Sequence, residues 1–226
     1  MAASATRRRA KPKLTRAERN EAVRARLFAA AAKVVGRHGY ADASVSRITT
    51  KAGVAQGTFY HHFRNRQEVL DELLPSIGRR MLDFIARRID RAASEEEKEI
   101  ARFRGFFDFL QEVPEFLRIL NEAEFFAPAG YQRHIDMIAE GYMRILRRGR
   151  DSGTMGDFTN EELEVVGHIL LGARAYLSRR YAYDGTRVHS IPEHVVSAYA
   201  KLLRGGLFTA GRSAVATAPR LARGGG

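Results

Sequence analysis

Apolar residues recur at intervals of three and four along most of the chain, which is the spacing of one face of an α-helix. In the first such segment, Val23, Leu27 and Val34 predict a helix from about Arg19 to His38, which Gly39 ends. The same spacing returns in each later segment, between proline and glycine residues that interrupt it. The sequence therefore predicts an all-α protein of about nine helices.

The stretch at residues 45–70 predicts two short helices joined by a tight turn, and it reads VSRITTKAGVAQGTFYHHFRNRQEVL. Ser44 stands at the N-cap of the first short helix, and Gly53 can take the left-handed conformation that ends it. Phe59 and Phe63 lie four apart on the second and are expected to face inward. This is the layout of a helix-turn-helix, whose second helix enters the major groove of DNA.

The same stretch resembles the DNA-binding signature of the TetR/AcrR family of bacterial regulators. The matching residues are Ile48, Ala52, Gly53, Val54, Gly57, Thr58, Tyr60, His62, Phe63, Asn65 and Leu70. The sequence departs from the family pattern at Ala55, usually Ser, and at Phe59, usually aliphatic. Arg66 and Gln67 stand for Lys and Glu, so only the positive charge is kept. The resemblance covers about the first third of the chain. It implies a ligand-responsive repressor that binds a palindromic operator as a homodimer.

Positive charge is concentrated in the part of the chain that carries this motif. The net charge of all 226 residues is +12, and residues 1–70 hold 15 Lys and Arg against 4 Asp and Glu. The remaining 156 residues hold 23 basic and 22 acidic residues. Neutralisation of DNA phosphates explains this segregation, which a generally basic surface would not produce. Double-stranded DNA is therefore the expected partner.

Within the motif, each polar residue has an expected role. The candidates for base edges are Gln56, Thr58 and His61, because a Gln side chain pairs with adenine through two hydrogen bonds. The candidates for phosphate contacts are Ser44, Tyr60 and Arg66, together with Arg47 and Lys51. Gly57 is expected to allow close approach of the backbone. The alternative for each polar residue is an exposed position that does not touch DNA.

Four segments are predicted along the chain. Residues 1–18 are a basic arm, residues 19–66 are the helix-turn-helix domain, residues 67–208 are a helical ligand-binding and dimerisation domain, and residues 209–226 are a flexible tail. The arm is expected to be disordered in isolation. It either contacts DNA, by following phosphates or by entering an adjacent minor groove, or serves only to keep the protein in solution.

A proline interrupts the helix that follows the motif. This helix is expected to begin near Arg66 and to hold an apolar stripe for five turns, with Pro75 inside it. Proline removes the hydrogen bond to the carbonyl of Asp71, so a kink is expected, or a break with a new helix that starts at Pro75. A kink at this point would set the position of the helix-turn-helix domain relative to the ligand-binding domain.

Phenylalanines gather between residues 103 and 126, on two predicted helices. Such a cluster either fills a core or lines an apolar cavity for a ligand. The candidate ligand-binding residues are Phe103, Phe107, Phe116, Leu120, Glu124, Tyr142 and Tyr176. The expected effector is a small hydrophobic, aromatic or fatty-acyl compound.

The predicted helix after Thr159 is apolar on two faces. Thr159 and Glu162 form a capping box, and Leu163 and Leu170 belong to an inner face. Its other face, which includes Val165, Ile169, Gly172 and Tyr176, must also be buried. The family resemblance implies that the last two helices pair across a two-fold axis, which would bury this second face in a homodimer.

Other chemistry is not indicated by the sequence. It contains no cysteine, its histidines lack metal-ligand spacing, and it shows no catalytic motif and no fingerprint of a cofactor site. Neither a signal peptide nor a membrane span is expected, which indicates a cytoplasmic protein. A second hypothesis is a constitutive or architectural DNA-binding protein without an inducer. A third, an enzyme on a helical scaffold, lacks any motif in its favour.

Overall fold

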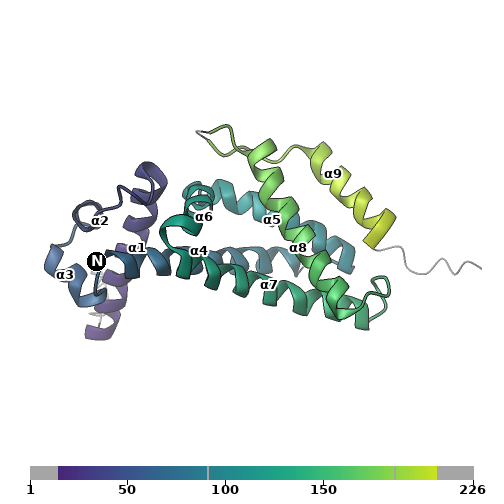
Figure 1. Ribbon diagram of the computed structural model, residues 1–226, viewed down its shortest axis with the longest axis horizontal. Helices are drawn as coiled ribbons and strands as arrows, with labels where there is room; N and C mark the ends of the chain where they lie inside the picture. Colours follow the sequence, from purple (N-terminus) through teal and green to yellow (C-terminus); the bar gives the residue numbers. More distant parts are fainter. Residues whose placement is uncertain (1–14, 91, 186, 208–226) are drawn as a thin grey trace, which may run out of the picture. The chain divides into compact units, whose positions relative to one another are not determined.

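The computed structural model describes residues 15–90, 92–185 and 187–207, and these residues form nine α-helices and two π-helical turns (Figure 1). The elements are α1 Arg16–His38, α2 Val45–Ala52, α3 Gln56–His62, α4 Arg66–Ile89, α5 Glu95–Glu112, α6 Glu115–Phe126, α7 Pro128–Asp151, α8 Asn160–Leu177, η1 Ser178–Ala182, α9 Glu193–Leu202 and η2 Leu203–Leu207. The all-α prediction is confirmed.

The described residues divide into two compact units. The first unit holds the residues up to Arg79 together with Val113–His134, and the second holds Arg80–Glu112 and the residues from Ile135 onward. The division falls inside α4 and α7, and it groups α6 with the helix-turn-helix. The sequence pattern did not indicate this grouping.

Helix α1 begins earlier than predicted because a capping box sets its first turn. The Thr15 hydroxyl accepts from Glu18 N at 3.2 Å, and the Glu18 carboxylate accepts from Thr15 N at 2.6 Å. These two bonds satisfy backbone donors that a helix start otherwise leaves without partners. The predicted disordered arm, residues 1–18, is therefore wrong for its last residues. Residues 1–14 of the arm lie outside the described part of the chain.

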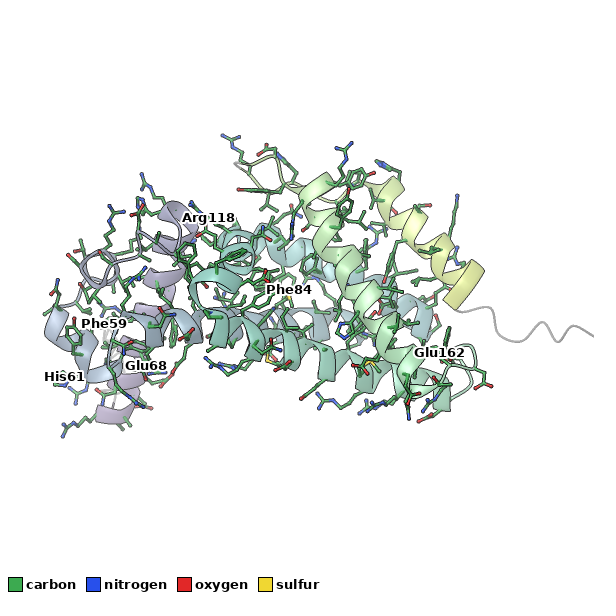
Figure 2. The ribbon with its side chains drawn as sticks, viewed as in Figure 1. Phe59, His61, Glu68, Phe84, Arg118 and Glu162 are labelled. Carbon is green, nitrogen blue, oxygen red and sulfur yellow. The ribbon has the colours of Figure 1, made fainter. Side chains whose placement is uncertain are left out.

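Helix α6 packs on the C-terminal end of α1 within the first unit. Glu122 Oε2 accepts from Tyr40 N at 2.8 Å, and Arg118 Nη1 donates to Arg37 O at 3.1 Å (Arg118 is labelled in Figure 2). A Cβ at Gly36 would collide with the side chain of Glu115. A glycine is thus required where the two helices approach each other. Side chains of α6 form hydrogen bonds with backbone groups at and just after the end of α1.

Helix α4 runs through Pro75 without a break, so no new helix starts there. Proline cannot donate to the carbonyl of Asp71, but Arg133 Nη2 donates to this oxygen at 2.9 Å. The first turn of α7 approaches so closely that a Cβ at Gly130 would overlap the same carbonyl. The sequence left a kinked and a broken helix open, and the structure excludes the break.

Helix α7 also begins earlier than the sequence predicts. The apolar spacing predicts that Pro128 ends one helix and that the next starts near Tyr131, but Pro128 is itself the first residue of α7. Proline suits this position because its missing N–H is not needed in the first turn. Near the end of the described chain, the glycine pair that follows Arg204 predicts a cap for α9, but Gly205 lies inside η2. The predicted tail, residues 209–226, lies outside the described part of the chain.

The core of the second unit is built around aromatic residues of α5. Phe103 stacks on Tyr199 of α9 with ring centroids 4.0 Å apart, and it also contacts Phe107 at 4.9 Å. Phe84 of α4 contacts Phe109 at 5.5 Å. Helix α8 begins at the predicted capping box of Thr159, and its buried face packs inward.

Candidate nucleic-acid interface

The helix-turn-helix forms where the sequence predicts it. The Ser44 hydroxyl accepts from Arg47 N at 3.2 Å and caps α2. Gly53 ends α2 in the left-handed conformation, with φ 64° and ψ 43°, where a side chain would strain the backbone. Ala55, which replaces the usual Ser, begins α3 without a side-chain hydrogen bond. The short turn thus depends on the positive φ of Gly53, and α3 begins without a side-chain cap.

Phenylalanines fix the orientation of α3. Phe59 and Phe63 are 0% and 1% exposed, and their ring centroids lie 5.3 Å apart. Phe28 of α1 meets Phe63 edge to face at 5.3 Å. Because these rings are buried, the polar residues between them must face solvent. Figure 2 labels Phe59 and His61, two residues apart on α3 and on different sides of it.

Two arginines of α1 hold both short helices by their C-terminal carbonyls. Arg26 Nη2 donates to Ala52 O at 2.6 Å and to Gly53 O at 3.1 Å, at the end of α2. Arg24 Nη1 donates to His62 O at 3.2 Å, at the end of α3. A cation suits the negative end of a helix. Sequence reasoning missed both residues, since their partners are distant in the chain.

Arg66 has a different environment from the one predicted for a phosphate contact. Its Nε donates to Ala43 O at 2.8 Å, and its Nη2 donates to Ala41 O at 3.1 Å and to Tyr40 O. The guanidinium group is thus committed to the loop between α1 and α2. We therefore give Arg66 a structural role and leave it out of the proposed DNA contacts.

Most of the other predicted DNA contacts share one property, which is exposure on α2 and α3. The exposed residues are Ser44, Arg47, Lys51, Gln56, Gly57, Tyr60 and His61, and Thr58 is half-buried. Tyr60 is 56% exposed despite its aromatic ring. Arg47 and Lys51 form no ion pair with any described residue, and a Cβ at Gly57 would meet no atom within 4 Å. The face is open and positively charged.

The predicted ligand residues divide between buried core positions and exposed positions. Phe103, Phe107 and Phe116 are each 0% exposed and pack in hydrophobic cores, as the core alternative expects. Glu124 is exposed and Tyr176 is 70% exposed. The other two candidates are Leu120, which is half-buried, and Tyr142, which is buried at 6% exposure. Phe116, Leu120 and Glu124 belong to the first unit, and the other four belong to the second.

An exposed apolar face lies on α8, within the second unit. Val165, Ile169 and Tyr176 are 58%, 62% and 70% exposed, and a Cβ at Gly172 would meet no atom within 4 Å. Their spacing of three and four places them on one side of the helix. Leu202 of α9 is 68% exposed. The predicted second apolar face of α8 is thus present and is not covered by the described part of its own chain.

In the described part of the chain, no group of three His, Cys, Asp or Glu residues is arranged to hold a metal ion. No described helix combines the length and apolar character that crossing a membrane requires.

Comparison with known proteins identifies the motif independently. The family model described as "Bacterial regulatory proteins, tetR family" matches residues 27–73. The fatty acid metabolism regulator protein of Bacillus subtilis is 27% identical over 140 residues, which are 62% of this chain and 72% of that protein.

Two solved structures extend the similarity to most of the chain. A TetR-family transcriptional regulator of Pectobacterium atrosepticum has a TM-score of 0.63 at 26% identity, covering 86% of this chain and 98% of its own. The regulator FadR of Bacillus subtilis, solved in complex with stearoyl-CoA, has a TM-score of 0.63 at 21% identity, covering 81% of this chain and 98% of its own. The second likeness shows a shared fold.

Proposed function

The chain belongs to the TetR family of bacterial transcriptional regulators, and we propose that it is a repressor released from its operator by a hydrophobic effector. The family comprises helix-turn-helix regulators and not enzymes. The observation that carries the proposal is the α2–turn–α3 unit. Its buried phenylalanines turn an open, polar and positively charged face away from the core.

We assign different tasks to the residues of this face. Gln56, Thr58 and His61 on α3 read base edges in the major groove. Arg47 and Lys51 on α2 form no ion pair within the described part of the chain and contact phosphates, which sets affinity for any sequence. Ser44 and Tyr60 contact phosphates through their hydroxyl groups, and the open space at Gly57 admits the DNA backbone.

We further propose that the protein acts as a homodimer through α8 and α9. The support is the exposed face of Val165, Ile169, Tyr176 and Leu202, which a monomer would leave in water. A two-fold axis would present two copies of α3 to successive major-groove faces, about 34 Å apart. The operator is then a palindrome.

The proposed effector carries a fatty-acyl chain. Support comes from the similarity to a protein named for the regulation of fatty acid metabolism and from the fold shared with a regulator solved with stearoyl-CoA. Release follows by linkage if the effector prefers a dimer geometry that does not fit the operator. An effector without such a preference would leave the operator occupied.

The test is DNA binding by the full-length protein to its own upstream intergenic region, at two salt concentrations and with competitor DNA. A footprint on a palindrome that survives competitor, and that dodecanoyl-CoA or another fatty-acyl compound abolishes, supports the proposal. A footprint that no such compound affects supports a constitutive DNA-binding protein. Binding that competitor removes entirely would show only non-specific phosphate contacts.

A further inference from the structure

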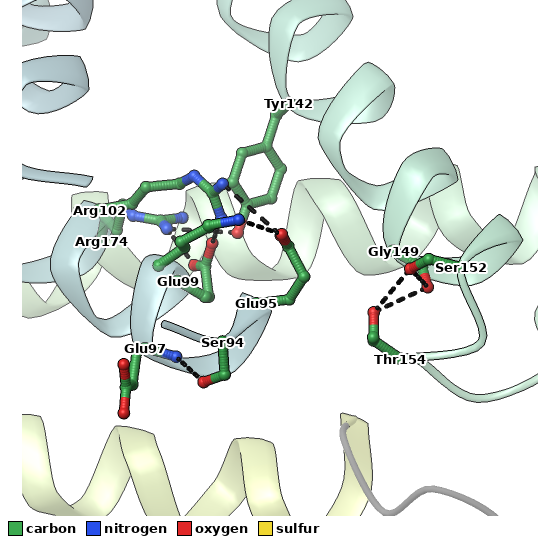
Figure 3. A network of polar contacts seen from close by, with 11 residues as sticks. Ser94, Glu95, Glu97, Glu99, Arg102, Tyr142, Gly149, Ser152, Thr154 and Arg174 are labelled. Atoms are coloured by element: carbon green, nitrogen blue, oxygen red, sulfur yellow. Dashed lines mark hydrogen bonds and ion pairs between the residues drawn. The ribbon is translucent and has the colours of Figure 1, made fainter. Parts of the chain in front are cut away.

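A buried carboxylate in the second unit is shared by helices that lie far apart in the sequence. Glu99 of α5 is 2% exposed, and its Oε1 accepts from Tyr199 Oη of α9 at 2.7 Å. The same oxygen accepts from Arg174 Nη2 of α8 (Figure 3 labels Glu99 and Arg174). One atom of α5 is therefore the acceptor for a side chain of α8 and for a side chain of α9.

Both oxygens of Glu99 have donors, which fixes the carboxylate in place. Its Oε2 accepts from Arg102 Nη1 at 3.3 Å. Arg174, which is 5% exposed, also donates to Leu170 O at 3.0 Å and to Tyr142 Oη of α7 at 3.2 Å. Moving such a carboxylate would separate buried charges from their partners, which is strongly unfavourable. Glu99 is therefore a firm reference point for the helices that bind it.

Tyr199 is attached to α5 by two different contacts. It is 5% exposed, its ring stacks on Phe103 with centroids 4.0 Å apart, and its hydroxyl donates to Glu99. Burial raises the pKa of the Tyr199 hydroxyl, so the group keeps its proton and remains a donor. A hydrogen bond to a charged acceptor depends more strongly on distance and direction than a ring stack does. The hydroxyl thus fixes the position of α9 most closely.

Two ion pairs nearer the surface also connect α5 with this part of the chain. Arg104 pairs with Glu193 at the start of α9, and Glu96 pairs with Arg204 in η2. The side chains of Glu193 and Arg204 are 72% and 63% exposed, and exposed ion pairs contribute little because water and salt screen them. Neither pair involves α8, so neither relates α9 to α8.

The proposed dimer surface lies on the exposed sides of these same two helices. On α8, Arg174 is buried and Tyr176, two positions later, is 70% exposed. On α9, Tyr199 is buried and Leu202, three positions later, is 68% exposed. In a two-fold dimer the same surface occurs on both copies, so a displacement of α9 against α8 would disturb the contact twice.

We propose that Tyr199, through its bond to Glu99, is a positioning residue for dimerisation, because it holds α9 in the place relative to α8 at which their exposed apolar residues fit a second copy. This rests on the proposed homodimer and names the buried group on which its interface depends. Both residues are buried, so they act on the partner through the helices that they connect. Since a palindrome takes two copies of α3, operator binding depends on the same bond.

Tyr199→Phe tests the proposal, because it removes the hydroxyl and keeps the ring that stacks on Phe103. Glu99 keeps its guanidinium partners, so the variant leaves no charge of the network without a counter-charge. Tyr142→Phe is the matched control, since it removes a hydroxyl of the same network that joins α7 to α8 and not α8 to α9. Sedimentation equilibrium of the full-length proteins gives the dimer dissociation constant, and circular dichroism confirms that the variants stay helical.

The dissociation constant of Tyr199→Phe should rise at least about fivefold, whereas that of Tyr142→Phe should change by less than about twofold. An unchanged constant for Tyr199→Phe, or an equal rise in both variants, would overturn the positioning role and leave the homodimer standing. A wild-type protein that sediments as a monomer at every concentration would overturn the homodimer and this inference together. Leu202→Ala should also weaken the dimer. If it did not, the interface would lie away from α9, and the inference would fail.

Discussion

Arg133 Nη2 donates a 2.9 Å hydrogen bond to the carbonyl of Asp71, the acceptor that Pro75 deprives of its helical N–H. A side chain from the second turn of α7 therefore replaces a backbone bond of α4. Glycine at position 130 lets the two helices come close enough for this contact. The proline and the arginine are thus parts of one arrangement, although they are far apart in the sequence.

The first prediction concerns this arrangement. Arg133→Met should lower the free energy of unfolding by about 0.5–1.5 kcal/mol, because the Asp71 carbonyl loses its donor. In a Pro75→Ala background the same change should cost less, since the backbone N–H that this substitution restores can donate to Asp71 O. Urea denaturation of both single variants and the double variant measures the coupling. Arg144→Met, which changes an exposed arginine further along α7, is the control. If Arg133→Met lowered the free energy of unfolding equally with proline and with alanine at position 75, Arg133 would not be replacing the missing backbone donor.

The second prediction separates stability from DNA binding at Gly57. Gly57→Ala should stabilise the free protein by up to about 1 kcal/mol, because alanine favours the helix and its Cβ meets no protein atom. Operator affinity should nevertheless fall, since the methyl group occupies the space proposed for the DNA backbone. Anisotropy titration and urea denaturation give the two quantities. An unchanged operator affinity would remove Gly57 from the interface.

Gly53→Ala is the contrasting change. Its φ of 64° strains any residue with a Cβ, so this variant should lose stability by about 1 kcal/mol or more. Any loss of DNA binding would then follow from the damaged turn.

The third prediction concerns basic residues with different tasks. Arg66→Met should lower the free energy of unfolding by about 1–3 kcal/mol, because carbonyls of the loop between α1 and α2 lose a charged donor. Lys51→Met should leave stability nearly unchanged and should lower the slope of log affinity against log salt by about one. Salt titrations of both folded variants distinguish the roles. A reduced slope for Arg66→Met at full stability would restore Arg66 as a phosphate contact.

The fourth prediction concerns pH and a buried histidine. Burial lowers the pKa of His134 to about 4, and the ring is 3% exposed with its Nδ1 unpaired. In the unfolded chain its pKa is about 6.5, so only the unfolded state takes up the proton between these values. Stability should therefore fall as the pH drops from about 6.5 to about 4, by at most roughly 3 kcal/mol from this residue.

The His134→Gln variant tests this assignment. Its free energy of unfolding, measured by urea denaturation, should depend less steeply on pH over the same range. His38→Gln, which alters an exposed histidine of the same unit, should follow the wild-type curve. Parallel curves for wild type and His134→Gln would show that other groups cause the pH dependence.

Local patterns in the sequence were sufficient for the helices and for the turn. The spacing of Phe59 and Phe63 predicted the inner face of α3, and Ser44 and Gly53 predicted both ends of α2. Each of these features depends on neighbours within a few residues. Two helix starts were missed, at Thr15 and Pro128, although they too depend on neighbouring residues. The capping box of Thr15 and the preference of proline for a first helical turn could have predicted both.

Other features depend on partners that are far apart in the sequence. Arg24 and Arg26 meet carbonyls 38 and 26 positions away, and Glu99 meets Arg174 across 75 positions. A basic residue that holds a loop and one that faces DNA look alike in a sequence. Likewise, helical spacing is the same for a phenylalanine in a core and for one in a cavity wall, so the ligand residues could not be separated from the core.

The length of α3 has a consequence for how the protein loses DNA. A seven-residue helix without a side-chain cap would be almost wholly unfolded as an isolated peptide. The polar face of α3 that is proposed to contact DNA therefore exists only while Phe59 and Phe63 stay buried. Local unfolding of α3 would abolish DNA recognition while the second unit stays folded. Operator occupancy would then decline on warming before the bulk of the helices melts, which would make the regulator sensitive to temperature even without an effector.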